Sequence, residues 1–262
     1  MRDLKVFAKL VRPRHTAQIT GIVIVISVMN HGLSPPTLFA VISSLLLSVA
    51  IFIFDDAHDV EADRIVHPER PIPKGSFTVH QGYLISAILM FAAALTASRL
   101  ELSQFAIFLT STVIAVAIVF LKIKSTLRAS LIALLIWTLF PFAGSLDLKN
   151  ILFGSIVALP HVGGSIAKDF VHSRGDAIQG LESPPDWSRY LASVALFLSS
   201  GIVWLPATLN LVTWLYIPPI MFTSISCVIL GAEILRENYR KAYIYGGIGM
   251  FSSLTAFLLG SL

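Results

Sequence analysis

The chain has 262 residues, of which 55% are hydrophobic and only 13% are charged, with a net charge of +4 and a mean hydropathy of +0.80. Roughly a quarter of the residues of an ordinary soluble domain are charged, so this composition excludes a soluble globular protein. We therefore expect an integral protein of the cell membrane, surrounded by membrane lipids. We infer neither a nucleic-acid partner nor a protein partner.

Nine apolar runs approach the ~20 residues that a helix needs to cross the hydrocarbon core of a bilayer. In chain order they cover residues 16–31, 36–54, 78–97, 103–121, 129–146, 150–170, 188–207, 212–232 and 241–261. The connections between them are short, so there is no room for a separate soluble domain. The sequence therefore predicts one all-α transmembrane domain, residues 1–262, with nine helices.

Two of these runs contain residues that usually break helices. They are Pro160 with Gly163 and Gly164, and the neighbouring pair Pro218 and Pro219. A membrane tolerates such breaks where the freed backbone groups are satisfied inside the protein. We therefore expect the helices to surround a central cavity.

The basic residues predict how the helices are oriented. Short cytoplasmic loops hold the excess of Lys and Arg, and nine spans place 17 of the 19 basic residues on one side, with only Arg99 and Lys149 on the other. This distribution predicts a cytoplasmic N-terminus and a C-terminus outside. Within the basic N-terminal segment, Arg12, Arg14 and His15 can either contact an anionic head group of an acceptor or anchor the chain at the membrane surface.

The second run ends in an unusually acidic stretch, "DDAHDVEADRIVHPERPIPKG". Asp55, Asp59 and Asp63 lie four residues apart with Asp56 beside them, so a helix that continued through them would carry these carboxylates on one face. Like charges at that spacing repel unless a cation lies among them, and a cluster of oxygen ligands suits Mg²⁺ rather than zinc. The alternative is an ordinary solvated loop at a helix end.

A second acidic stretch, "KDFVHSRGDAIQG", follows the sixth run. Asp169, His172 and Asp176 have spacings of three and four, which Asp56, Asp59 and Asp63 repeat. This weak internal repeat favours metal ligands on two sides of one cavity. The predicted metal ligands are therefore Asp55, Asp56, Asp59, Asp63, Asp169, His172 and Asp176.

Basic residues near both stretches can bind phosphate oxygens. The candidates are Arg70, Lys122, Lys124, Lys168 and Arg174, although basic residues also belong on the cytoplasmic side for reasons of topology alone. Mg²⁺ and cations at the mouth of an apolar cavity indicate an isoprenyl diphosphate substrate, whose C–O bond ionises as the metal and the cations stabilise the departing diphosphate. In this chemistry Asp55, Asp59 and Asp176 are the predicted catalytic residues, and the mouth of the site faces the cytoplasm.

These motifs resemble those of the UbiA superfamily of intramembrane prenyltransferases. The first is similar to the family's N-D-x-x-D-x-x-x-D motif followed by R-P-x-P-x-G, with Asp55 at the place of the Asn; the second is similar to the family's later acidic motif, with His172 at the place of an Asp. Within the superfamily, the residues of the two motifs are most similar to those of archaeal geranylgeranyltransferases of ether-lipid synthesis. The resemblance implies transfer from geranylgeranyl diphosphate to a lipid acceptor such as geranylgeranylglyceryl phosphate.

Other functions remain open at this point. Within the same superfamily the acceptor can be an aromatic quinone precursor, or the substrate's own double bond can capture the cation, as in a terpene cyclase. Outside enzymology, the chain can be a transporter or a non-catalytic lipid-binding homologue. A transporter would more naturally place single ionisable groups near the midplane of the membrane, whereas these acids cluster at helix ends.

Overall fold

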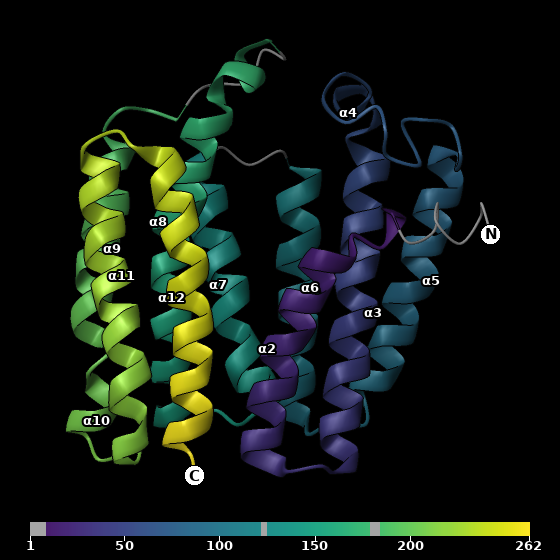
Figure 1. Cartoon of the computed structure of the whole chain (residues 1–262). Coiled ribbons are helices and arrows are strands. Elements are labelled where there is room, and N and C mark those ends of the chain that lie inside the picture. Colours follow the sequence, from purple (N-terminus) through teal and green to yellow (C-terminus); the bar gives the residue numbers. More distant parts are fainter. Residues whose placement is uncertain (1–8, 122–124, 179–183) are drawn as a thin grey trace. The chain divides into compact units, whose positions relative to one another are not determined.

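The computed structural model describes residues 9–121, 125–178 and 184–262; at positions 14, 66, 125, 172–178 and 240–248 it describes the backbone alone. Every regular element within these ranges is helical, and they contain no strand (Figure 1). The prediction of an all-α protein is therefore confirmed.

The helical elements of the described residues follow one another from α2 to α12. In order they are α2 (Pro13–His31), α3 (Pro35–His58), α4 (Val60–Val66), α5 (Val79–Ala97), α6 (Leu102–Phe120), α7 (Ser125–Ala143), α8 (Leu148–Ile178), α9 (Ser188–Ile202), α10 (Leu205–Thr208), the 3₁₀ turn η1 (Trp214–Tyr216), α11 (Ile217–Leu235) and α12 (Tyr239–Gly260). The nine predicted runs fall on helical elements, because apolar runs of that length favour helices in a membrane. The run 188–207 is divided between α9 and α10, and the run 212–232 between η1 and α11.

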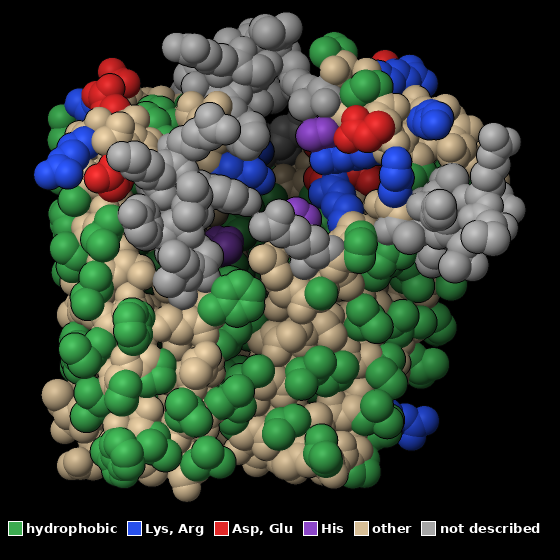
Figure 2. Space-filling view, in the orientation of Figure 1, with side chains coloured by type: hydrophobic (Ala, Val, Ile, Leu, Met, Phe, Trp, Pro, Cys, Tyr) green, Lys and Arg blue, Asp and Glu red, His purple; other side chains and the backbone are tan. Residues whose placement is uncertain are grey.

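Seven helical segments in the described part of the chain are long and apolar enough to cross a membrane. They are Pro35–His58, Val79–Ala97, Leu102–Phe120, Thr126–Ala143, Leu148–Val171, Ser188–Thr208 and Trp214–Leu235. Hydrophobic side chains are spread over much of the face that Figure 2 shows, and most of its charged side chains lie toward the top of the view. The chain is an integral membrane protein.

The chain divides into two compact units, and unit 1 comprises residues 1–122 with 142–144. In unit 1, α3 packs against α2, α5 and α6. The close contact of α3 with α5 depends on Gly82, since a Cβ there would lie 2.9 Å from Ile72 Cδ1 and 3.0 Å from Ala57 Cβ. This contact fixes the end of α3 that carries the first acidic stretch.

Residues 142–144 are attached to unit 1 by polar side chains of α2 and α6. The buried Gln104 donates from Nε2 to the carbonyl oxygens of Phe142 and Gly144, both at 2.9 Å, and Ser27 Oγ donates to the carbonyl oxygen of Ala143 at 3.0 Å. These bonds satisfy carbonyl groups at the end of α7 that have no partner within the helix.

Unit 2 comprises residues 123–141 and 145–262. In it α11 packs against α9 and α12, and α8 packs against α9 and α12. Gly163 of α8 allows a close approach to α9, because a Cβ there would lie 2.7 Å from Leu196 Cδ1 and 3.0 Å from the Ala192 carbonyl oxygen. Its small size therefore serves helix packing. Pro218 and Pro219 lie in the first turn of α11, where proline is tolerated, rather than breaking a helix.

Candidate active site

The first acidic stretch is divided between two helices. Asp55 and Asp56 lie in the last turn of α3, Asp59 is the residue between α3 and α4, and Asp63 lies in α4. No single helix runs through all four residues, because α3 ends at His58. Backbone bonds still connect the turns, since Asp59 N–H donates to the Asp55 carbonyl oxygen at 2.9 Å and Asp63 N–H donates to the Asp59 carbonyl oxygen at 2.8 Å.

Arg70 connects the two helices through their carboxylates. Its Nη1 donates to Asp56 Oδ1 at 3.1 Å and to Asp63 Oδ2 at 2.6 Å. The side chain of Asp56 is 1% exposed and that of Asp63 is 10% exposed, whereas Arg70 keeps 25% of its side chain exposed. The loop holds Arg70 in this place because the nearby Ile72 is buried in the core cluster around Ile53 and Ala57. The phosphate-binding role of Arg70 stays a prediction; the structure shows that Arg70 holds two of the acids together.

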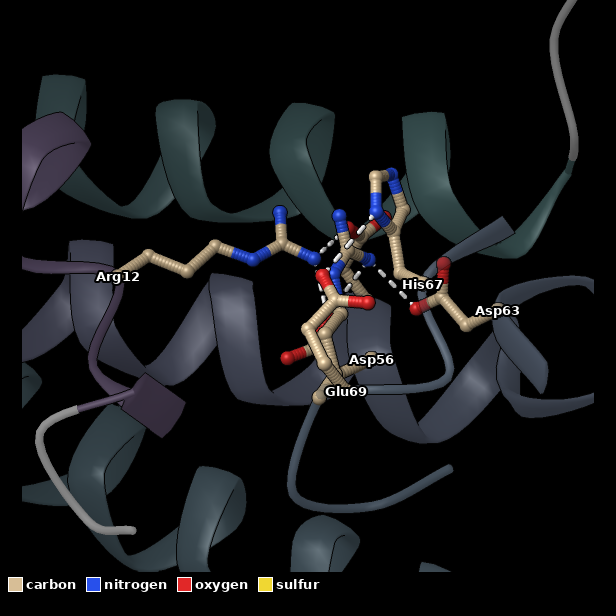
Figure 3. A network of polar contacts seen from close by, with 7 residues as sticks. Arg12, Asp56, Asp63, His67 and Glu69 are labelled. Atoms are coloured by element: carbon tan, nitrogen blue, oxygen red, sulfur yellow. Dashed lines mark hydrogen bonds and ion pairs between the residues drawn. The ribbon is translucent and has the colours of Figure 1, made fainter. Parts of the chain in front are cut away.

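Arg12 approaches the same carboxylates from the segment before α2. Its Nη2 lies 3.0 Å from Asp55 Oδ2 and also donates to Asp56 Oδ1 (Figure 3). Burial by itself lowers the pKa of the Arg12 guanidinium, and the carboxylates of Asp55 and Asp56 more than reverse this, so its pKa lies above the ordinary value. The only signal of this role in the sequence is the positive charge of Arg12, and its pairing with Asp55 and Asp56 was not predicted.

The exposed rim of the network holds a weaker pair. His67 Nδ1 lies 3.5 Å from Glu69 Oε1, and both side chains are largely open to solvent. The pKa of the Glu69 carboxyl lies below its ordinary value. The main cause is a hydrogen bond from the backbone N–H of Glu69 to its own carboxylate, and the attraction of nearby His67 adds to it. This pair marks the solvent side of the buried network around Asp56 (Figure 3).

The aromatic side chains of unit 1 surround His58, the last residue of α3. Its ring lies 6.1 Å from Phe54 and 5.6 Å from Phe120, and the Tyr83 hydroxyl lies 3.4 Å from its Nδ1. His58 therefore lies among aromatic side chains at the end of α3.

The donor set at the end of α3 fits Mg²⁺ in its chemistry. No three His, Cys, Asp or Glu side chains in the described part of the chain are grouped closely enough to hold a metal ion, so side chains must shift to provide three ligands. However, Asp56 Oδ2 is buried and has no hydrogen-bond partner among the described residues. A buried carboxylate oxygen without a partner is costly, and a hard cation is one group that can satisfy it.

The second acidic stretch lies in α8 of unit 2. Its backbone is helical through Ile178, so Asp169, His172 and Asp176 share one face, as the spacing predicts. Arg128 of α7 contacts Asp169, with 3.1 Å between Nη2 and Oδ1, while Lys168 is exposed. The side chains of His172, Arg174 and Asp176, and residues Lys122 and Lys124, lie outside the described residues. From the sequence alone, the positive charge of Arg128 was explained only by the excess of basic residues on the cytoplasmic side.

Comparisons with known proteins agree with the fold. A digeranylgeranylglyceryl phosphate synthase of Natronomonas pharaonis is 26% identical over 100% of this chain and 99% of its own length. A solved structure described as digeranylgeranylglyceryl phosphate synthase in membranes matches with a TM-score of 0.86 and 22% identity, over 100% of this chain and 99% of that one.

A UbiA homologue from Archaeoglobus fulgidus, solved with GPP and Mg²⁺ bound, has the same fold with a TM-score of 0.59 and 13% identity, covering 98% of this chain and 100% of its own. Residues 19–245 match the model of the UbiA prenyltransferase family. Together with the acidic end of α3, this match over most of the sequence establishes that the chain belongs to the UbiA prenyltransferase family.

Proposed function

We propose that this prenyltransferase moves a geranylgeranyl group from geranylgeranyl diphosphate to a lipid acceptor, such as geranylgeranylglyceryl phosphate, in a reaction that depends on Mg²⁺. The observation that carries the proposal is the buried network at the end of α3, where Arg70 joins Asp56 to Asp63 beside an unsatisfied carboxylate oxygen. The name of the Natronomonas relative supports the donor and the acceptor, and the ligands of the Archaeoglobus homologue support the metal and the diphosphate.

The acids at the end of α3 have a common role in this proposal. Asp55, Asp56, Asp59 and Asp63 provide oxygen ligands in unit 1, and Mg²⁺, when bound, supplies positive charge to the leaving diphosphate. Asp55 and Asp59 are proposed as catalytic residues because they lie toward the open end of the network, whereas Asp56 is buried beneath it.

Arg70 is proposed to contact the diphosphate while it holds the acids. Its Nη1 makes the contacts to Asp56 and Asp63, and a guanidinium carries five N–H donors. It can therefore hold both carboxylates and donate to a phosphate oxygen at the same time. Lys122, Lys124, Lys168 and Arg174 are proposed to serve the same diphosphate.

The internal repeat in the sequence supports a second set of ligands. Asp169, His172 and Asp176 on α8 are proposed to act on the same diphosphate, with Asp176 as the catalytic residue among them. Arg128 neutralises Asp169 as Arg12 and Arg70 neutralise Asp56. At both acidic helix ends, an arginine from another part of the chain thus balances the charge of a carboxylate before any ligand binds.

The membrane arrangement is part of the proposal. All nine long helices cross the bilayer in one domain, residues 1–262, around a cavity that takes the prenyl chain, with the N-terminus and the mouth of the site on the cytoplasmic side. Seven helical segments in the described part of the chain are long and apolar enough to cross a membrane, which supports an integral membrane protein. The charge distribution between the loops supports the count of nine and the orientation.

The deciding experiment incubates purified protein with radiolabelled geranylgeranyl diphosphate and Mg²⁺, with and without geranylgeranylglyceryl phosphate. We expect a labelled lipid product that requires both the acceptor and Mg²⁺. A hydrocarbon formed without acceptor would instead show cyclisation, and a product formed only with an aromatic acceptor would reject the lipid acceptor.

A further inference from the structure

The segment that precedes α2 is packed onto the acidic end of α3. Leu10 is fully buried in the core cluster of unit 1, together with Ile53 and Ala57 of α3. Arg12 follows two residues later, and its side chain is 18% exposed. An apolar anchor therefore brings a cation to the carboxylates.

The backbone conformation of Arg12 is fixed at the start of α2. Its φ of 46° and ψ of 64° lie in the left-handed region, which costs free energy for any residue other than glycine. Its carbonyl oxygen accepts the N–H groups of His15 and Thr16, both at 3.1 Å, and so begins α2. One residue thus starts α2 with its backbone and holds the end of α3 with its side chain.

The surroundings of the guanidinium fit a charge-balancing role. Arg12 Nη2 contacts both Asp55 and Asp56, and its Cζ lies 5.3 Å from the centre of the Phe52 ring. Two adjacent carboxylates, one of them buried, repel each other unless a cation lies between them. Arg70 reaches Asp56 and Asp63, whereas the contact to Asp55 comes from Arg12.

We propose that Arg12 is the resident counter-ion of the acidic end of α3: it holds Asp55 and Asp56 in place and competes for them with the divalent cation. The second part rests on the proposed function, because it needs Mg²⁺ at these carboxylates. The first part does not, because it concerns the metal-free protein. Arg12 is therefore a positioning residue.

Thermal unfolding of the full chain in detergent tests this proposal. In EDTA, Arg12→Gln should lower Tm by roughly 5 °C or more, because it leaves a buried carboxylate with less compensation. In a Mg²⁺ titration, its Tm should rise at a concentration about three- to tenfold lower than in the wild type, because the competing charge is gone.

Arg64→Gln is the matched control. It removes the same charge from α4, but Arg64 is exposed and pairs with Glu61 rather than with the buried acids. Its Tm in EDTA and its Mg²⁺ midpoint should stay near those of the wild type. If Arg12→Gln behaves like Arg64→Gln in both measurements, the proposal is wrong.

A double variant keeps the test decisive if Arg12→Gln does not fold. Once Asp56→Asn has removed the buried charge, the loss of Arg12 should cost much less, so the double variant should fold and its Tm should lie near that of Asp56→Asn. A double variant that also fails to fold, or that unfolds far below the Tm of Asp56→Asn, would overturn the counter-ion role. An acceptor KM that rises in Arg12→Gln with both Tm measurements unchanged would assign Arg12 to the acceptor instead.

The Mg²⁺ titration of the wild type tests the proposed function independently of the counter-ion role. If Mg²⁺ does not raise the Tm of the wild type, the metal assignment and the competition are both wrong. The comparison in EDTA and the double variant still decide whether Arg12 holds Asp55 and Asp56.

Discussion

Replacing Arg70 with Gln removes a side chain that contacts both Asp56 and Asp63. Removing one partner of a fully buried ion pair costs about 3–5 kcal/mol, because the remaining charge is left uncompensated. Here Arg70 is 25% exposed and Asp56 keeps its contact with Arg12, so the expected loss of unfolding free energy is smaller, about 1–3 kcal/mol.

The same variant should lose more in catalysis than in stability. If Arg70 also donates to the departing diphosphate, its removal takes away electrostatic stabilisation of the transition state, and contacts of this kind are worth roughly 10²–10³ in kcat. We expect kcat/KM for geranylgeranyl diphosphate to fall by about 100-fold, on the low side of that range. Arg70→Lys should recover only part of the activity, because an ammonium group cannot reproduce the fork of a guanidinium.

The assay compares Arg70→Gln with Lys74→Gln. Lys74 is an exposed cation in the same loop, so its removal changes the net charge equally without touching the acids. Labelled product is measured at saturating Mg²⁺, and Tm is measured on the same samples. If Arg70→Gln retains activity within about threefold of Lys74→Gln, the ligand role of Arg70 is wrong; if the Tm values of the two variants also agree, the contacts of Arg70 to Asp56 and Asp63 do not stabilise the protein.

Three further predictions concern other parts of the chain. Asp59→Ala should fold and extract like the wild type, but its kcat should fall roughly 10²–10³-fold; near-normal turnover would reject the role of Asp59 as a metal ligand. His172→Asp should lower the Mg²⁺ concentration for half-maximal activity, because Mg²⁺ prefers carboxylate to imidazole; an unchanged or higher requirement with reduced turnover would show that His172 does something else. Gln104→Leu should lower the unfolding free energy by about 1–3 kcal/mol, because two carbonyl groups at residues 142 and 144 lose their donor; an unchanged Tm would mean that these bonds do not hold the end of α7.

The helix positions were predictable from the sequence because a bilayer requires long apolar runs and internal backbone hydrogen bonds. The interruption at Asp59 was not, since the spacing of Asp55, Asp59 and Asp63 is equally compatible with one continuous helix. Gly163 was interpreted as a sign of a cavity, whereas the structure uses it for contact with Leu196 and Ala192. Periodicity does not show which neighbour a small residue faces.

The acidic residues were found because carboxylates are rare beside membrane helices, but their partners were not. Arg12 lies 43 residues from Asp55 in the sequence, and its charge was already explained by the excess of basic residues on the cytoplasmic side. Asp169 and Arg128 are separated by 41 residues in the same way. Such pairings arise from tertiary packing, which a single sequence does not encode in any local pattern.

The acids at the end of α3 are proposed to bind a prenyl diphosphate through Mg²⁺. The most direct test is equilibrium binding of a non-ionising thiolodiphosphate analogue of geranylgeranyl diphosphate to the purified chain, with Mg²⁺ or with EDTA, in the wild type and in Asp59→Ala. We predict binding that requires Mg²⁺ and is weakened at least about tenfold in the variant, because a metal ligand is lost. Equally tight binding in EDTA, or binding unaffected by Asp59→Ala, would contradict the account.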